Sequence, residues 1–414
     1  MMLLFYSVGI RLYHFAACVA ALFSAKAKLF CDGRKGVFEK LLKEVEQNHS
    51  PHIWFHCSSF GEYEQGRPVL HKLKASYPDH RIVLTFFSPS GYAQGVKDAA
   101  ADCVLYLPSD SVAHARKWIS LLNPSLAVFV KYDFWFHYMN ELSSKKIPFV
   151  YVSAIFRSNQ FFFKSWAQSF LSILRKASAF YVQNHSSAEL LKQHGIHRVV
   201  VTGDTRFDRV VQLPGTPFSD AVIENFSEGD EPVIVAGSTW PQDHKLLAEY
   251  INKNPSAKMI LIPHEVNESS ISSFTSLCNK KSILYSQADH LHQPQASVLI
   301  IDRIGMLSKI YRYATWCYIG GGFGKGIHNI LEGAVYGKPV VFGPHYHKFA
   351  EAVRLIQLGG AFAVSDAAQL QTVFDKFIAT KEFTEHAGAI SKSFVSENAG
   401  ATDAVMKQLQ HLIS

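Results

Sequence analysis

The stretch Tyr318-Ile-Gly-Gly-Gly-Phe-Gly-Lys-Gly-Ile-His-Asn-Ile-Leu-Glu332 passes from an apolar run into five glycines and then into a helical pattern. We predict a strand, a tight turn and a helix that begins near His328 or Asn329. Glycines let a backbone approach a ligand closely, and a helix N-terminus offers free N–H groups to a phosphate. The spacing fits neither GxGxxG nor GxxxxGK[ST], which argues against a dinucleotide fingerprint and a P-loop.

Two charged residues belong to the same turn. Lys325 could add a positive charge beside a phosphate, and Glu332 could accept both hydroxyls of a ribose. The alternative is a tight connection without a ligand, followed by an ordinary glutamate that the helix dipole favours.

Short apolar runs alternate with helix-length segments on both sides of this turn. Before residue 213 the predicted strands are His52–Ser59, Arg81–Phe87, Cys103–Leu107, Leu126–Lys131, Pro148–Ser153, Phe180–Gln183 and Val199–Gly203. After residue 220 they are Val233–Gly237, Lys258–Pro263, Ser282–Tyr285, Val298–Asp302, Trp316–Gly320, Pro339–Gly343 and Ala361–Val364. Strands separated by helices imply parallel sheets with helices on both faces.

A proline-containing break at Leu213–Asp220 separates the two arrays. We therefore predict an α/β protein with two Rossmann-like lobes that face a cleft, where ligands meet the C-terminal ends of the strands. The predicted domains are a membrane anchor at 1–30, an N-terminal lobe at 31–215, a C-terminal lobe at 216–395, and a helix at 396–414 that packs back on the N-terminal lobe.

The N-terminus is mostly apolar up to residue 30 and is interrupted by Arg11. A basic flank follows, which consists of Lys26, Lys28, Arg34 and Lys35. A cleaved signal peptide carries its positive charge before the apolar run, not after it. We predict an uncleaved anchor that spans a membrane or lies in its interface, and a buried N-terminal helix is the alternative.

Composition excludes several classes of protein. Of the 414 residues, 48% are apolar and 18% are charged, which is too apolar for a disordered chain. The net charge of +7 favours anionic ligands or lipid headgroups, and we predict no nucleic-acid partner. Six cysteines without a CxxC pair argue against a disulfide scaffold and a zinc ribbon. The pair His345 and His347 lacks a third ligand, so we predict no metal site.

Glu62 is the candidate catalytic residue of the first lobe, because it follows a strand and a turn of small residues at a helix start. A glutamate there can act as a general base if burial raises its pKa, and helix capping is the alternative. In the second lobe, Ser238 or Thr239 is the expected N-cap of the next helix. The further candidate residues for donor or acceptor binding are Ser59, Gly61, Ser88, Ser90, Gly91, Arg157, Gly237, Ser238, Thr239 and Lys325.

Together these motifs closely resemble the 3-deoxy-D-manno-octulosonic acid (Kdo) transferases of Gram-negative bacteria. The resemblance covers nearly the whole chain in order. The matching segments are Gly33-Arg-Lys35, Ser59–Glu62, Ser88-Pro-Ser-Gly91, Lys131-Tyr-Asp-Phe-Trp135, Thr202–Asp208, Gly237-Ser-Thr239, Gly326–Glu332 and Gly343-Pro-His345.

This resemblance implies a GT-B glycosyltransferase of family 30, which moves Kdo from CMP-Kdo to a lipid A precursor (lipid IVA) at the cytoplasmic face of the inner membrane. It implies Glu62 as the base. Direct displacement of CMP would invert the anomeric carbon, and because no Asp-x-Asp motif follows a first-lobe strand we expect no cofactor or metal. The residues that it aligns with the CMP site are Pro263, His264, Ile304, Gly305, Met306, Asn329, Ile330, Leu331 and Glu332. Relative to enterobacterial members, Met306 and Asp133 each replace a glutamate, Ile330 replaces a proline, and Pro263-His-Glu265 replaces Pro-Arg-His.

Two alternatives remain, one with the same fold and one from a different class. One is a GT-B transferase or epimerase that uses a UDP- or GDP-sugar, which shares the two lobes and the ribose-binding glutamate. The other is a membrane-attached binding protein without catalytic activity. A melting shift with CMP but not with UDP or GDP would argue against the first alternative. Loss of turnover in Glu62→Ala would argue against the second.

Overall fold

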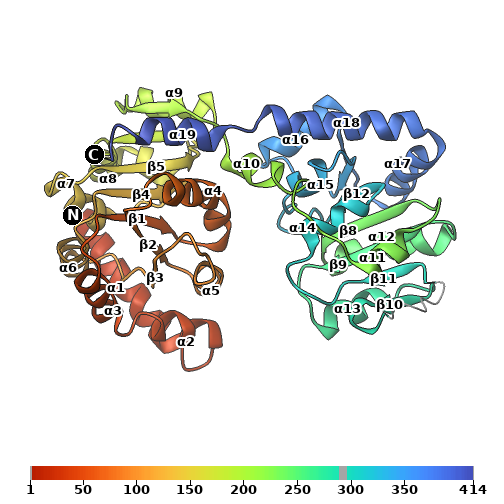
Figure 1. The fold of residues 1–414 in the computed structure, drawn as a ribbon, viewed down its shortest axis with the longest axis horizontal. Coiled ribbons are helices and arrows are strands. Elements are labelled where there is room, and N and C mark those ends of the chain that lie inside the picture. Colours follow the sequence, from red (N-terminus) through yellow and green to blue (C-terminus); the bar gives the residue numbers. More distant parts are fainter. Residues whose placement is uncertain (1, 289–295, 414) are drawn as a thin grey trace. The chain divides into compact units, whose positions relative to one another are not determined.

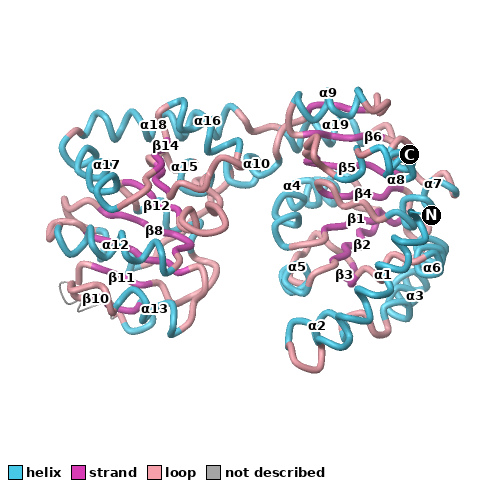
Figure 2. Tube along the Cα trace, turned by 180° about the vertical axis from the view of Figure 1, so that it is seen from behind, coloured by secondary structure: helices cyan, strands magenta, loops and turns pink. Residues whose placement is uncertain are grey.

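The computed structural model describes residues 2–288 and 296–413, which form two compact units. Unit 1 contains the chain up to Arg209 together with the segment from Ala399 onward, and unit 2 contains Val210–Asn398. Each unit is built on one parallel sheet of seven strands (Figure 1). Helices cover both faces of each sheet (Figure 2).

In unit 1 the strand order is β3-β2-β1-β4-β5-β6-β7. The strands are β1 (His52–Cys57), β2 (Arg81–Phe86), β3 (Cys103–Tyr106), β4 (Leu126–Val130), β5 (Phe149–Ala154), β6 (Ala179–Val182) and β7 (Val199–Val201). The helices are α1 (Met2–Ala20), α2 (Ala25–Asp32), α3 (Val37–Gln47), α4 (Phe60–Ser76), α5 (Pro89–Gly95), α6 (Val112–Leu122), α7 (Phe136–Ser144), α8 (Gln168–Leu174), α9 (His185–Gln193), α10 (Thr205–Val211, which crosses into unit 2) and α19 (Ala401–Leu409).

In unit 2 the strand order is β10-β11-β9-β8-β12-β13-β14. The strands are β8 (Val233–Thr239), β9 (Lys258–Pro263), β10 (Ser282–Leu284), β11 (Val298–Ile300), β12 (Trp316–Ile319), β13 (Val340–Phe342) and β14 (Ala361–Ala363). The helices are α11 (Ala221–Ser227), α12 (Pro241–Lys253), α13 (Glu268–Thr275), α14 (Leu307–Ile310), α15 (Leu331–Ala334), α16 (Ala350–Leu358), α17 (Ala367–Ala379) and α18 (Lys381–Glu397).

Every predicted strand is confirmed, with bounds that differ by at most two residues. The reason is that a sheet covered on both faces requires strands that are apolar along their whole length. In β1 all six positions are buried. Trp54 packs into the cluster on one face, while Ile53 and Phe55 pack into the cluster on the other face.

The C-terminal segment returns to unit 1 after α18. Helix α19 packs against α4, and Val405, Met406 and Leu409 are buried in the cluster on that face of the unit 1 sheet. Asp208 of α10 caps the N-terminus of α19. The Asp208 carboxylate accepts the Thr402 N–H at 2.6 Å, the Thr402 hydroxyl at 2.6 Å and the N–H of Gly400. The hydrogen bonds between Asp208 and Thr402 join residues that lie 194 positions apart in the chain.

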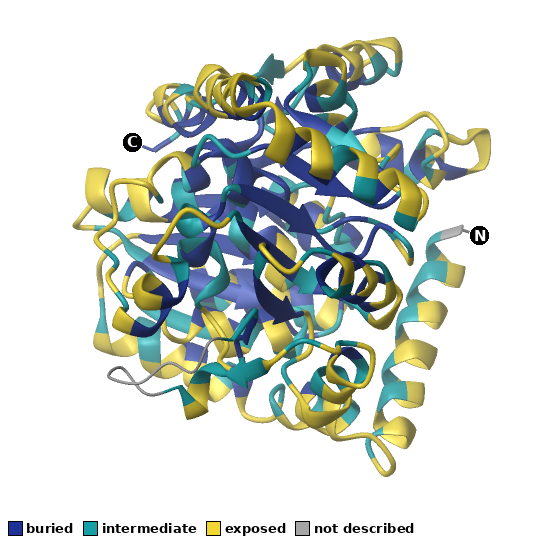
Figure 3. Cartoon of the chain, turned by 90° about the vertical axis from the view of Figure 1, so that its right-hand side faces the viewer, coloured by how far each residue is buried: buried dark blue, intermediate teal, exposed yellow. Residues whose placement is uncertain are grey.

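Helix α1 packs against unit 1 through one side. The Tyr6 hydroxyl donates to Asp110 Oδ2 at 2.6 Å, and the Ser7 hydroxyl lies 3.0 Å from His137 Nε2. Its other side is exposed, as the teal and yellow helix at the N-terminus shows in Figure 3. The exposed apolar residues of α1 are Leu4, Phe5, Val8, Leu12, Tyr13, Phe15 and Val19. Among the described residues, this is the one helix that is long and apolar enough to cross a membrane.

Arg34 departs from its expected place in the basic flank. Its guanidinium donates to the carbonyl oxygens of Phe30 at 2.8 Å, Phe87 at 2.8 Å and Leu107 at 3.0 Å. It also lies over the Phe30 ring, 3.7 Å from the centroid. Burial lowers the Arg34 pKa to about 10, so the side chain keeps its charge at neutral pH. Arg34 therefore fastens the N-terminal segment to the rest of unit 1, whereas Lys26, Lys28 and Lys35 are exposed.

Candidate active site

Glu62 lies in the first turn of α4, directly after the C-terminal end of β1. The Ser59 N–H and hydroxyl donate to Glu62 Oε2 at 2.8 Å and 3.1 Å, and the Glu62 N–H donates to the Ser59 hydroxyl at 3.4 Å. This reciprocal pair is a capping box. Both Ser59 donors bind Oε2. The residue is 9% exposed, so Glu62 combines a capping role with a sheltered carboxylate.

Burial raises the pKa of Glu62 above its usual range, although the Ser59 hydrogen bonds and the charge of Lys131 oppose the rise. Asp133, from the loop after the neighbouring strand β4, has a pKa well above its usual value because of burial and the nearby Glu62 carboxylate. Two buried carboxyl groups in one place resist double ionisation. The pair can therefore hold a proton at a pH where isolated carboxylates have lost theirs.

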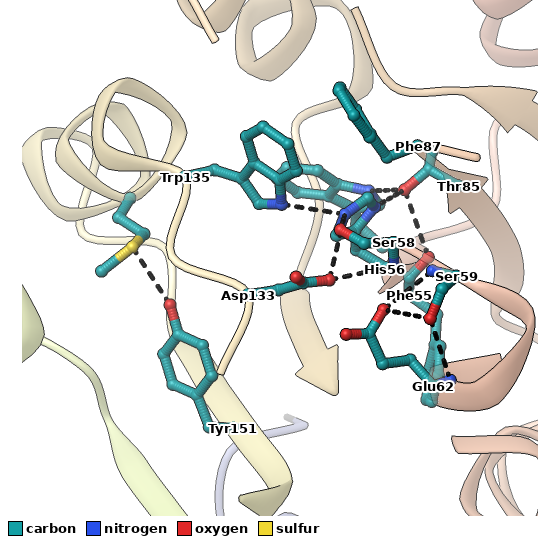
Figure 4. A network of polar contacts seen from close by, with 12 residues as sticks. Phe55, His56, Ser58, Ser59, Glu62, Thr85, Phe87, Asp133, Trp135 and Tyr151 are labelled. Atoms are coloured by element: carbon teal, nitrogen blue, oxygen red, sulfur yellow. Dashed lines mark hydrogen bonds and ion pairs between the residues drawn. The ribbon is translucent and has the colours of Figure 1, made fainter. Parts of the chain in front are cut away.

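Hydrogen bonds of His56, Trp135 and Ser58 hold the loop that carries Asp133 in place beside Glu62 (Figure 4). His56 Nε2 accepts the Trp135 indole N–H at 2.9 Å, and His56 Nδ1 lies 2.8 Å from the Thr85 hydroxyl. Complete burial lowers the pKa of His56 to about 3, so its ring is neutral near pH 7. The Ser58 N–H donates to Asp133 Oδ2 at 2.9 Å. His56 and Trp135 were not predicted as site residues, and Trp135 ends the Lys131-Tyr-Asp-Phe-Trp135 motif.

The loop after β2 lies next to the Ser58–Ser59 turn, because the Ser88 N–H donates to the Ser58 carbonyl at 2.8 Å. The Ser88 hydroxyl caps α5 by accepting the Gly91 N–H at 3.2 Å, and the Ser90 hydroxyl lies 3.2 Å from it. At Gly91 a Cβ atom would meet the Phe86 ring at 2.5 Å, so that glycine serves packing. The serine hydroxyls remain the ligand-capable groups of this loop.

Two further predicted residues of unit 1 have open surroundings. At Gly61 an added Cβ atom would meet nothing within 4 Å, which leaves room beside Glu62. Arg157 follows the C-terminal end of β5 and is exposed, with its backbone N–H bonded to Gln160 Oε1 at 2.8 Å. Its guanidinium makes no hydrogen bond or ion pair within the described ranges.

In unit 2, three flat side chains stack at the C-terminal ends of β8, β9 and β12. The His264 ring packs against both Trp240 and His328, with centroid distances of 4.7 Å and 4.3 Å, and the centroids of those two rings are 6.5 Å apart. The Trp240 indole N–H donates to His328 Nε2 at 3.0 Å. Burial lowers the pKa of His264 and lowers that of His328 to about 4, so the stack is neutral near pH 7. Of these residues only His264, which directly follows Pro263, was predicted as a site residue.

The glycine-rich turn differs from its prediction. The helix after it, α15, begins at Leu331 and not at His328 or Asn329, and it has only four residues. The segment before it forms a hydrogen-bonded turn instead: the Gly324 and Gly326 N–H groups donate to the Gly321 carbonyl, and the His328 N–H donates to the Gly320 carbonyl at 3.2 Å. The turn is thus held largely by its own backbone.

Asp243 of α12 ties this turn to the loop after β8. Its carboxylate accepts the Trp240 N–H at 2.8 Å, the Gly321 N–H at 3.0 Å and the Tyr318 hydroxyl at 2.7 Å. The expected N-cap at Ser238 or Thr239 is therefore wrong: Trp240 is the N-cap, and the carboxylate of Asp243 bonds its N–H.

The residues predicted after β8 have other partners. The Thr239 hydroxyl bonds His244 Nε2 at 3.0 Å, and Ser238 adopts a positive φ of 53°. A Cβ atom at Gly237 would lie 2.0 Å from the Tyr311 hydroxyl, so this glycine admits the tyrosine ring. These contacts pack Gly237 and Thr239 within unit 2, and a ligand role of the segment stays a prediction.

The remaining predicted residues of unit 2 fall into exposed and buried groups. Ile304 is 86% exposed, Gly305 has a φ of +91°, and Met306 is the half-buried N-cap of α14. By contrast, the side chains of Ile330 and Leu331 lie in the core, so only their backbones can reach a ligand.

The polar groups of the turn are more accessible. Asn329 Nδ2 donates to Glu332 Oε1 at 3.3 Å, and Lys325 is exposed. In the described part of the chain, no group of three His, Cys, Asp or Glu side chains could hold a metal ion.

The fold is similar to that of the UDP-GlcNAc 2-epimerase from Neisseria meningitidis, solved with UDP-GlcNAc bound. The TM-score is 0.62 at 14% identity, and the alignment covers 87% of this chain and 100% of that one. The chain contains two parallel seven-stranded α/β units and resembles solved structures such as this epimerase. These findings define the class: the protein has a GT-B fold.

Residues 33–209 match the family described as 3-deoxy-D-manno-octulosonic-acid transferase (kdotransferase). The chain is 26% identical over 348 residues to the 3-deoxy-D-manno-octulosonic acid transferase of Aquifex aeolicus, covering 82% of this chain and 90% of that protein. It is 23% identical over 370 residues to the enzyme of the same name from Haemophilus influenzae, covering 86% of each. Residues 33–209 thus match the Kdo transferase family, and these relatives along most of the chain are Kdo transferases, so the protein is a glycosyltransferase.

Proposed function

We propose that the protein is an inverting glycosyltransferase that moves Kdo from CMP-Kdo to a lipid A precursor, lipid IVA, in lipopolysaccharide biosynthesis. The observation that carries this proposal is Glu62, a sheltered carboxylate of raised pKa inside the segment that matches the family. Its raised pKa suits a group that must accept a proton near neutral pH.

In the proposed step, Glu62 Oε1 takes the proton from the acceptor hydroxyl as that oxygen attacks the anomeric carbon of Kdo. The bond from this carbon to the phosphate oxygen breaks, and its electron pair leaves with CMP. Attack opposite the departing phosphate inverts the anomeric centre. Because the anomeric carbon of this 2-keto sugar acid bears no hydrogen, positive charge develops there as the bond to phosphate lengthens.

We assign donor binding to unit 2. The neutral stack of Trp240, His264 and His328 offers flat surface, and Glu332 offers a carboxylate to the ribose hydroxyls. Lys325 supplies a positive charge, which stabilises the negative charge on the departing phosphate. The proposed step uses no metal ion, which agrees with the lack of an Asp-x-Asp motif after the first-unit strands.

We place the protein on the cytoplasmic face of the inner membrane. The exposed apolar side of α1 and the exposed lysines at positions 26, 28 and 35 support this location. The contacts of Tyr6 and Ser7 with unit 1 favour a helix that lies in the interface over one that spans the bilayer.

The decisive experiment is product mass spectrometry after incubation with CMP-Kdo and lipid IVA. We expect the wild type to add Kdo and Glu62→Gln to lose about 10²- to 10⁴-fold in rate while it still binds CMP, because only the base is removed. Glu39→Gln, which changes an exposed glutamate at the start of α3, is the matched control. Full activity in Glu62→Gln would refute the proposed role.

Thermal shifts identify the nucleotide. We expect CMP to raise the melting temperature and UDP or GDP to leave it unchanged, because a ligand that binds only the folded state stabilises it. A shift with UDP instead would favour the UDP-sugar alternative.

We also expect turnover to survive treatment with EDTA. A loss of turnover that added Mg²⁺ restores would contradict the metal-free step.

A further inference from the structure

A cavity of about 630 Å³ opens in unit 1 between α1 and the first turn of α6. Two arginines, Arg11 and Arg116, and two histidines, His14 and His114, line it together with serine hydroxyls that include those of Ser7 and Ser111. No aspartate or glutamate is among the lining residues. The cavity therefore presents positive charge and hydrogen-bond donors to whatever enters it.

The two arginines of the cavity have no acceptors in the described chain. Arg11 and Arg116 are exposed and form no hydrogen bond or ion pair with any described residue. By contrast, Arg34 in the same unit has three carbonyl acceptors, as a guanidinium with a structural role requires. Guanidinium groups bind phosphate well, because their planar donors match its oxygens.

The start of α6 adds to this positive potential. The helix has 11 residues and carries its partial positive charge at its N-terminus, where Val112 and Ala113 line the cavity. The nearby Asp110 carboxylate is fully buried and accepts the Tyr6 hydroxyl and the His137 N–H. Because its oxygens bind these groups and it is not a lining residue, Asp110 does not occupy the cavity itself.

Apolar surface borders the same cavity. Phe15 lines it and is 68% exposed, and Leu12 on the same helix is 62% exposed. An anion held by Arg11 would therefore have a hydrocarbon surface beside it. A phosphate joined to acyl chains matches this arrangement, whereas a free phosphate would leave the apolar border uncovered.

We propose that this cavity binds the phosphate headgroup of an anionic membrane phospholipid, with its acyl chains along the exposed side of α1. The inference rests on the proposed membrane location and goes beyond the transfer reaction. Headgroup binding would fix how α1 lies on the membrane, because the lipid would contact both α1 and α6.

Vesicle flotation of the full-length protein tests this site. We expect the wild type to bind vesicles of 70% phosphatidylcholine and 30% phosphatidylglycerol about tenfold more tightly than pure phosphatidylcholine vesicles. The double variant R11Q/R116Q should lose most of that preference while it keeps its binding to phosphatidylcholine. The control K40Q/K43Q removes the same charge from exposed positions on α3 outside the cavity and should keep the preference.

A second measurement distinguishes a lipid from a free anion. We expect dihexanoyl phosphatidylglycerol, below its micelle concentration, to raise the melting temperature of the wild type but not that of R11Q/R116Q. Inorganic phosphate at the same concentration should give little shift. Equal shifts with both, or equal losses in the two double variants, would overturn the lipid site. Its failure is distinguishable from failure of the proposed function, which product mass spectrometry reads separately.

Discussion

At the scale of single residues, Glu62 combines two tasks that usually oppose each other. As the N3 residue of a capping box it accepts the Ser59 donors, which stabilises its charged form. As a buried carboxylate it is destabilised in the charged form, and burial is the larger effect because the net pKa shift is upward. Activity that needs ionised Glu62 is therefore present above this raised pKa and is lost as the pH falls through it.

Ser59→Ala tests this balance. The substitution removes the hydroxyl donor at 3.1 Å from Glu62 Oε2, so the pKa of Glu62 should rise further. The acid limb of the kcat/KM profile should then move to higher pH. Asn184→Ala, which removes the cap of α9, costs about 1 kcal/mol of stability without touching Glu62 and should leave the limb in place. An unmoved limb in Ser59→Ala would contradict the argument.

At the scale of elements, the capping of α19 by Asp208 shows how a segment distant in sequence becomes part of unit 1. The helix is short, so its own hydrogen bonds cannot keep it folded in isolation. Burial of Val405, Met406 and Leu409 against α4 supplies the driving force, and Asp208 fixes where the helix begins.

Asp208→Ala should therefore loosen α19 without altering the sheets. The loss of three hydrogen bonds to one carboxylate should lower the free energy of unfolding by about 1–3 kcal/mol. Limited proteolysis should then cut near residue 399 faster than in the wild type. Asp403→Ala, an exposed neighbour paired with Lys72, is the control. Equal cleavage in both variants would mean that Asp208 does not hold the helix.

At the scale of the whole molecule, the N-terminal segment combines an exposed apolar side with polar ties to unit 1. Deletion of residues 2–23 should move the protein from the membrane pellet to the supernatant, because it removes most of the exposed apolar side chains of this segment. Melting should also occur at a lower temperature, since the Tyr6 hydrogen bond to Asp110 is lost. A truncated protein that still sediments with membranes would point to another attachment surface.

The sequence alone determined the α/β class, the fourteen strands and the turn that carries Glu62, because buried parallel strands and helix starts are written in local patterns. The family resemblance, read from motifs along the chain, also required no coordinates. Local patterns failed at the glycine-rich turn, where the His328 N–H donates to the Gly320 carbonyl and the helix begins only at Leu331.

Only the tertiary structure decided which distant residues meet. Asp133 comes close to Glu62 because β4 lies next to β1 in the sheet, and the separation of 75 positions between Ser58 and Asp133 gives no local sign of it. Likewise, His264 and His328 stack because their strands flank β8. Strand order depends on how crossovers pack over the whole sheet, so periodicity within one segment cannot specify it.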